Sequence, residues 1–195
     1  FMHRPRNEPR FYGGKMPFIQ TGDVVRSAGY IRKYAQTLNE QGIAISRVFS
    51  AGTILITIAA NIGYSGVLEF DAACPDSLVA ISPSSRLSNL YLNYYLQTQQ
   101  AKMDQGAPKG TQKNINIQFL SPWPVLVPSL DEQHEIVTIL DAIDRKIDLH
   151  RKKREVLEEL FESLLHKLMT GEIAVSDLDL SALSPASTQH EEATA

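Results

Sequence analysis

The most regular pattern of apolar positions lies between residues 129 and 171. Over this stretch, apolar side chains recur in alternating steps of four and three residues, and two polar residues occupy the middle of the row. This row, called here the heptad seam, consists of Ile136, Leu140, Ile143, Ile147, His150, Arg154, Leu157, Phe161, Leu164 and Leu168. A narrow seam of this period is typical of a helix that packs along another helix in a coiled coil.

Signals for the start and the end of a helix flank the seam. Ser129 and Glu132 have the spacing of a capping box directly after Pro128, and Gly171 follows the last apolar turn. A helix of about 40 residues is roughly 60 Å long, whereas a small domain spans ~30 Å. Half of this helix therefore needs a partner. The alternative is a core helix of an ordinary α/β domain. The charged run at 151–155, in the middle of the seam, argues against this alternative.

The pattern before residue 129 predicts a small strand-rich domain, so the expected fold class is α+β. Residues 16–25, 52–70 and 77–82 are β-branched or apolar runs bounded by Gly, Asp and Pro, and residues 87–106 form the one clear helical interlude. Within 52–70, Ile54, Ile56 and Ile58 alternate along a strand, and Asn61 and Gly63 suit the tip of a hairpin. Residues 106–120 alternate Gly, Lys, Thr, Gln and Asn without an apolar period, as in a loop that contacts something polar.

These patterns predict three regions: a domain at 1–128, the coiled-coil helix at 129–171, and a disordered acidic tail at 172–195. The charge differs between the two halves. Residues 1–129 contain 12 Lys and Arg against 7 Asp and Glu (+5), whereas residues 130–195 contain 7 against 15 (−8), which together give the net charge of −3. A basic domain joined to an acidic helix is expected if the domain binds phosphate groups and the helix binds another protein.

Composition and motifs argue against several other classes. The single cysteine, Cys74, leaves no disulfide framework, so a reducing cytoplasm is expected. No apolar run is long enough for a membrane span, and the first ten residues lack the apolar stretch of a signal peptide. Because the chain enters patterned sequence almost at once after Phe1 and Met2, we expect N-terminal residues to be missing. No Gly-x-Gly cofactor loop, Walker A motif or Asn-Pro-Pro-aromatic tetrad is present, and Thr138 stands where a zinc-protease helix has its second His. We therefore expect no cofactor, no metal and no catalysis, with Cys74 as a buried small hydrophobe.

Several segments together resemble a known family. "YGGKMPFIQTGDV" (12–24 with its neighbours), "IAANIG" and the junction "GTQKNINIQFLSPWPVLVPSLDEQ", followed by the long helix and "TGEI", are similar to the DNA specificity subunit of type I restriction-modification systems. The resemblance covers roughly residues 11–173. It implies a target-recognition domain, a Pro-rich strand at 121–128 and a spacer helix, and a full subunit carries two such units with their helices packed antiparallel. This chain carries one unit, so that a fragment and a natural half-subunit both stay open.

The resemblance also implies the partners. They are double-stranded DNA, methylation subunits that carry S-adenosylmethionine and a nuclease (restriction) subunit, in a prokaryotic cytoplasm. The partner of the spacer helix would be a second copy of this chain, giving a homodimer, or the second half of a longer subunit. The chain would supply recognition, while its partners supply the chemistry. Two other classes remain: a coiled-coil adaptor whose domain binds protein, and a free-standing DNA-binding regulator without a methyltransferase.

Candidate DNA-contacting residues follow from side-chain chemistry within the predicted loops. Arg, Lys, Asn and Gln are the side chains best suited to base edges, and Lys and Arg also bind phosphate. On these grounds the candidates are Arg26, Arg32, Lys33, Asn61, Tyr64, Lys109, Thr111, Gln112 and Lys113. Asn114 and Asn116 are expected instead to hold the polar loop in shape through bonds to the backbone.

Overall fold

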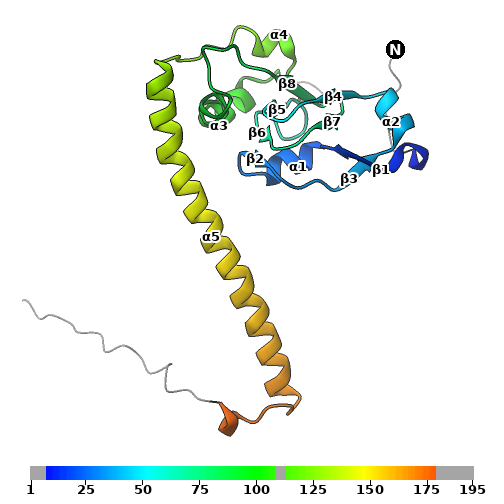
Figure 1. Cartoon of the computed structure of the whole chain (residues 1–195), viewed down its shortest axis with the longest axis vertical. Helices are drawn as coiled ribbons and strands as arrows, with labels where there is room; N and C mark the ends of the chain where they lie inside the picture. The colour runs from blue at the N-terminus through cyan, green and yellow to red at the C-terminus, as the bar shows by residue number, and fades with distance from the viewer. Residues whose placement is uncertain (1–7, 109–112, 179–195) are drawn as a thin grey trace, which may run out of the picture. The chain divides into compact units, whose positions relative to one another are not determined.

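The computed structural model describes residues 8–108 and 113–178, and the chain divides into two compact units. The N-terminal unit ends at Asp141 and the C-terminal unit begins at Ala142. In chain order the N-terminal unit contains η1 (Pro9–Phe11), β1 (Tyr12–Phe18), α1 (Thr21–Arg26), β2 (Tyr30–Ile31), β3 (Gln36–Leu38), α2 (Glu40–Ala44), β4 (Arg47–Phe49), β5 (Ile54–Thr57), β6 (Ser65–Leu68), β7 (Ala72–Cys74), β8 (Leu78–Ile81), α3 (Asn89–Gly106) and α4 (Ile117–Leu120). Helix α5 (Leu130–Met169) begins in this unit and continues through the second, which also contains η2 (Val175–Asp177) (Figure 1).

Two four-stranded sheets form the centre of the N-terminal unit (Figure 1). Sheet A has the strand order β3-β1-β7-β4 and sheet B the order β2-β6-β5-β8. Each sheet contains one parallel pair, β1 with β7 and β2 with β6, and the other pairs are antiparallel. The expected strand-rich α+β fold with a long C-terminal helix is therefore confirmed.

Strand β5 is buried on both faces, and its pleat explains why its sequence is continuously apolar. Ile54 and Ile56 face a cluster that includes Leu92 and Met103 of α3, whereas Leu55, between them, faces a second cluster that includes Ile19 and Val24. Successive strand residues point to opposite faces, so a strand with a core on both sides needs no polar alternation. The strand predicted over Ile54, Ile56 and Ile58 is confirmed for the first two, and Ile58 lies just beyond its end at Thr57.

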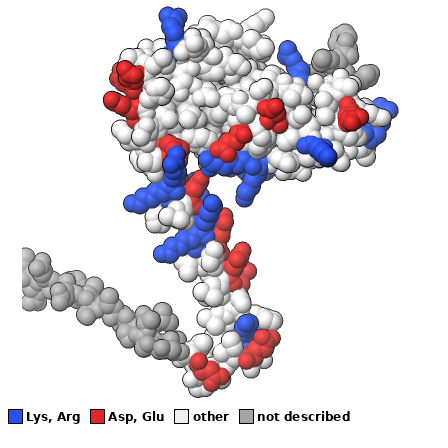
Figure 2. All heavy atoms as spheres, viewed as in Figure 1, with Lys and Arg blue, Asp and Glu red and all other residues white. Residues whose placement is uncertain are grey.

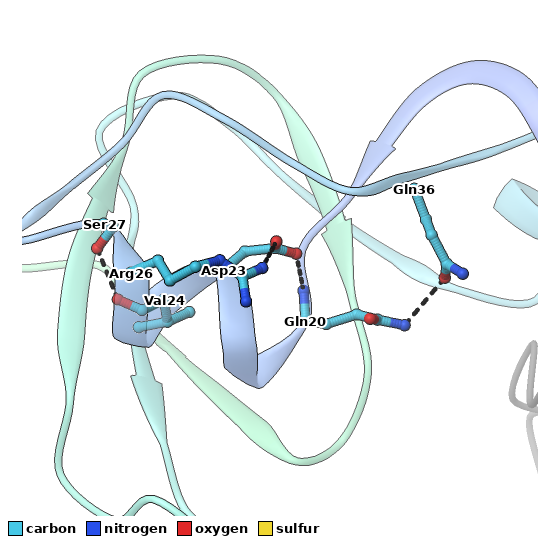
Figure 3. Close-up of polar contacts among 6 residues, drawn as sticks. All are labelled: Gln20, Asp23, Val24, Arg26, Ser27 and Gln36. Atoms are coloured by element: carbon cyan, nitrogen blue, oxygen red, sulfur yellow. Dashed lines mark hydrogen bonds and ion pairs between the residues drawn. The ribbon is translucent and has the colours of Figure 1, made fainter. Parts of the chain in front are cut away.

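The first predicted strand, 16–25, was wrong in its second half. β1 ends at Phe18, and helix α1 follows at Thr21. A capping box starts this helix. The Gln20 backbone N–H donates to the Asp23 carboxylate at 2.9 Å (Figure 3), and the Asp23 N–H donates to the Gln20 carbonyl at 3.0 Å. Two orphan N–H groups are satisfied in this way, and this local chemistry outweighs the strand preference of Val24 and Val25.

The Pro-rich segment 121–128 contains no assigned strand, which corrects the strand implied by the resemblance. Pro124 and Pro128 have no N–H to give to a neighbouring strand. Their carbonyls accept side-chain bonds instead, from Tyr95 Oη at 3.1 Å and from Gln133 Nε2 at 2.9 Å, and Tyr91 Oη donates to Leu126 O at 2.9 Å.

Helix α5 is 40 residues long, with ends that match the predicted signals. Ser129 Oγ accepts from the Glu132 N–H at 3.3 Å, and Gly171 takes a left-handed φ of 76° just after the helix. Such a φ favours glycine over any residue with a Cβ. In the region predicted as a tail, η2 forms a short helical turn, and residues 179–195 lie outside the described residues.

Candidate nucleic-acid interface

The tip of the β5–β6 hairpin is held by one buried threonine. Thr57 has no exposed surface, and its hydroxyl donates to Asn61 O and accepts from the Tyr64 N–H at 3.0 Å. Gly63 has a φ of 83°, and a Cβ there would lie 3.2 Å from the Gln100 backbone of α3. The tip is thus fixed from inside, while Asn61 and Tyr64 stay exposed on its surface. Thr57 was not among the predicted residues, although a Thr at the end of an apolar run before a Gly-containing turn is a usable signal.

The segment after the polar loop is fastened to this tip. The Ile115 N–H donates to Ile58 O at 2.9 Å, Asn114 forms an antiparallel bridge with Ala59, and the Ile115 side chain is buried in the α3 cluster. Lys113 lies directly before this attachment, and its ammonium forms an ion pair with Asp104 of α3 at 2.8 Å. Residues 58–64 and 113–116, called here the tip surface, therefore come together although about fifty positions separate them in sequence.

The predicted shaping role of Asn116 is confirmed. Its Oδ1 accepts from the Phe119 N–H at 2.9 Å and caps α4. Asn114 instead joins the tip through its backbone bridge. The candidates Lys109, Thr111 and Gln112 lie outside the described residues.

Arg26 lies on α1 and is tied to a buried carboxylate (Figure 3). Its Nη2 donates to Asp23 Oδ1 at 2.8 Å, where the Asp23 side chain is only 4% exposed and the Arg26 side chain 69%. A buried carboxylate is costly unless it is paired and hydrogen-bonded. Arg26 thus has a structural partner in addition to the DNA contact predicted for it.

Arg32 and Lys33 lie at the other end of sheet B from the tip surface. They follow β2, which runs parallel to β6, and β6 starts at the tip after Tyr64 and ends at Leu68. Arg32 Nε donates to Glu69 Oε1 at 2.8 Å, just beyond that end, and its guanidinium lies 4.7 Å from the centre of the Tyr30 ring. The structure therefore brings together Asn61, Tyr64 and Lys113, and separates Arg32 and Lys33 from them.

Charge on the N-terminal unit is mixed. On the face seen in Figure 2, Lys and Arg side chains are interspersed with Asp and Glu and do not form one continuous basic patch. Arg10, Arg26, Arg32 and Lys113 each form an ion pair within this unit. The positive balance of residues 1–129 alone therefore does not mark a binding surface.

The heptad seam of α5 is largely accessible to solvent in the single chain. Four of its apolar residues, Ile143, Ile147, Leu157 and Phe161, are 40–65% exposed, and Ile136, Leu140, Leu164 and Leu168 are half-buried. His150 and Arg154 are exposed as well. A row of apolar positions that the described residues leave this exposed is typical of a helix that pairs with another helix.

Cys74 is a packing residue. It lies in the core cluster between the sheets, and burial raises the pKa of its thiol to about 12 even though the nearby Arg47 acts in the opposite direction. The thiol is therefore neutral near pH 7, as a poor nucleophile would be. Within the described residues, no three His, Cys, Asp or Glu side chains are grouped as a metal site needs, and none of the helices has the length and apolar character to cross a membrane.

Comparison with known proteins gives one family. The model of the type I restriction modification DNA specificity domain matches residues 4–159. The type I restriction enzyme MjaIX specificity subunit of Methanocaldococcus jannaschii is 26% identical over 155 residues, which cover 77% of this chain and 36% of that protein. The putative MjaX specificity subunit of the same organism is 29% identical over 123 residues, covering 63% and 29%.

Solved structures share the fold. The HsdS subunit from Thermoanaerobacter tengcongensis aligns with a TM-score of 0.57 at 22% identity over 88% of this chain, and the type I restriction-modification S subunit from M. genitalium with 0.55 at 20% over 82%. These alignments cover 42% and 44% of the two structures, so the chain spans less than half the length of the relatives it matches. Because the family match extends over most of its length, this chain belongs to the family of type I restriction modification DNA specificity domains.

Proposed function

We propose that this chain recognises a DNA sequence for a type I restriction-modification system, and that the tip surface contacts the DNA. The observation that carries the proposal is the attachment of residues 113–116 to the hairpin, through the 2.9 Å bond from Ile115 to Ile58 and the bridge between Ala59 and Asn114. It joins two polar segments on a scaffold held by a buried Thr57. Readers of base edges need such a rigid support, since one misplaced hydrogen bond removes their discrimination.

Different roles follow from the chemistry of the exposed groups. The Asn61 amide can donate to and accept from a base edge, and the Tyr64 ring and hydroxyl can pack against sugar or phosphate. Lys113 is suited to bind a phosphate group, and in doing so it would break its ion pair with Asp104. Lys109, Thr111 and Gln112, which precede Lys113 in sequence, remain candidates.

The chemistry is proposed to reside in partner subunits. This chain would direct an adenine methyltransferase and a nuclease to the target site. The proposal fits the relatives, which are named as specificity subunits, and the neutral, buried thiol of Cys74. Such a protein works where prokaryotic DNA is found, in the cytoplasm. The accessible heptad seam supports pairing with a second copy of the chain, so that a half-subunit presents two recognition domains.

A binding assay with matched lysines tests the interface. The full chain is used to select duplexes from a random library, and binding is then measured as a function of salt. Lys113→Ala should weaken binding to every sequence and lower the salt slope by about 0.9 per lost phosphate contact. Lys33→Ala, at the far end of sheet B, should change neither.

Asn61→Ala should act in another way. If the amide reads a base edge, discrimination at one position falls by about 1–3 kcal/mol while the salt slope is kept. Equal effects of Lys33→Ala and Lys113→Ala, or unaltered selection by Asn61→Ala, would remove the tip surface from the interface.

A further inference from the structure

Only one of the 40 residues of α5 is buried, and it is polar: Gln133 has no exposed surface. A buried amide is tolerated when its donors and acceptor are satisfied. Gln133 Oε1 accepts from the Ser88 N–H at 2.8 Å, and Nε2 donates to Arg86 O at 3.1 Å and to Pro128 O at 2.9 Å. The amide thus uses three backbone groups that belong to two separate segments.

These bonds need an amide and no other side chain. A glutamate would turn a carboxylate toward two carbonyl oxygens, and an apolar side chain would leave the Ser88 N–H without its acceptor. Ser88 is also the N-cap of α3, where its Oγ accepts from the Tyr91 N–H at 3.5 Å. Gln133 therefore ties the first turn of α5 to the first turn of α3.

A second attachment lies eight residues further along α5. Tyr30 Oη of β2 donates to Asp141 Oδ1 at 3.0 Å. The Tyr30 ring carries the Arg32 guanidinium 4.7 Å from its centre, and Arg32 is held in turn by Glu69 at 2.8 Å. Eight residues correspond to about 12 Å along a helix. One attachment would let residues 130–141 pivot against the rest of the N-terminal unit, whereas two at this separation hold this first part of the helix in place.

We propose that Gln133 and the Tyr30–Asp141 contact form a joint that sets the direction in which α5 leaves the recognition domain, and that this joint thereby selects the gap between the two half-sites read by the paired protein. In this joint Arg32 supports Tyr30 and is not a DNA contact. The second clause rests on the proposed function, because a gap exists only if two copies bind DNA. Gln133 and Tyr30 are then positioning residues.

The joint itself is tested without DNA. Spin labels at Ala101→Cys on α3 and Lys152→Cys on α5, off the seam, report the distance between domain and helix, and an excess of unlabelled chain keeps at most one labelled copy in a pair. Cys74 is buried and its thiol pKa is raised by that burial, so it should stay unlabelled while the chain is folded. The distance distribution should be narrow in the parent chain and should broaden in Gln133→Met/Tyr30→Phe. Tyr95→Phe, which removes a 3.1 Å bond to Pro124 outside α5, is the control and should leave the distribution narrow.

The gap is tested with duplexes that the parent chain selects, in which the half-sites are kept and the spacing is changed one base pair at a time. The double variant should bind a single half-site as the parent does but lose its preference for one gap, from about tenfold or more to less than about threefold. Tyr30→Phe alone, which removes one oxygen, provides the same readout if the double variant fails to fold. An unchanged distance distribution overturns the joint, and a broadened distribution with an unchanged gap preference overturns its role in spacing. If the parent chain selects no duplex, the proposed function fails, and the spin-label distances still decide the joint.

Discussion

The heptad seam offers a test of self-pairing at Phe161, whose side chain is 65% exposed. A phenylalanine offers roughly 200 Å² of surface, so about 130 Å² is left for a partner to cover. At about 25 cal/mol per Å² this burial contributes about 3 kcal/mol per copy. Phe161→Ala keeps only Cβ, so it should lose about 2 kcal/mol per copy, about 4 kcal/mol in a symmetric pair, and raise the dissociation constant about 10³-fold.

Sedimentation equilibrium over a range of chain concentrations measures this constant directly. Leu149→Ala is the matched control, because Leu149 is 66% exposed on the same helix but lies off the seam. It should keep the pairing constant of the parent within a few-fold. If Phe161→Ala keeps the parent constant, or if Leu149→Ala weakens pairing equally, the seam is not the surface that pairs.

Three further outcomes are expected within the N-terminal unit. Arg26→Ala should lower the free energy of unfolding by about 1–3 kcal/mol in a denaturant titration, because the buried Asp23 carboxylate loses its charged partner. Gly14→Ala should prevent folding or lower the melting temperature by several degrees in calorimetry, since its Cβ would meet Leu38 O at 2.3 Å, whereas real Cβ atoms essentially never lie under 3.0 Å. Cys74 should resist a thiol reagent at pH 8 until the protein unfolds, because its pKa is raised to about 12 by burial; fast labelling of the native chain would contradict this.

Helix α5 could be predicted from the sequence because its determinants are local. The apolar period, the Ser129 cap and the left-handed Gly171 all lie within or next to the helix. The β5–β6 hairpin could be predicted for the same reason, since its two strands and its turn are contiguous in sequence. Strand β2, two residues long, has no period to detect and exists because β6 offers it parallel partners at Val67 and Leu68.

The candidate site was predictable only in part because it depends on topology. Lys113 and Tyr64 come together through a bridge between Ala59 and Asn114, which no local pattern announces. Arg32 follows an apolar strand, and in the sequence it looks like any surface cation. Its surroundings depend on the direction of β2 and on the ion pair with Glu69. Gln133 ends the "LDEQ" segment that carries part of the family resemblance. Its burial could not be predicted, because it depends on backbone carbonyls supplied by other segments, such as that of Arg86.

If two copies pair through α5 as proposed, the symmetry of the pair determines the symmetry of the DNA site. Two identical domains related by a two-fold axis should read the same base pairs in inverted orientation, so the modified site should be an interrupted palindrome. Deleting residues 148–154 removes one heptad and moves Leu157 into the seam position of His150, so pairing should survive while the helix shortens by roughly 10 Å. The preferred gap should then change by about 3 base pairs at ~3.4 Å each. Deleting only 148–151 breaks the seam period and should abolish pairing. Mapping modified adenines in cells that carry the chain with its methyltransferase provides the readout, and an asymmetric bipartite motif would mean that two different domains read the site, which rules out self-pairing.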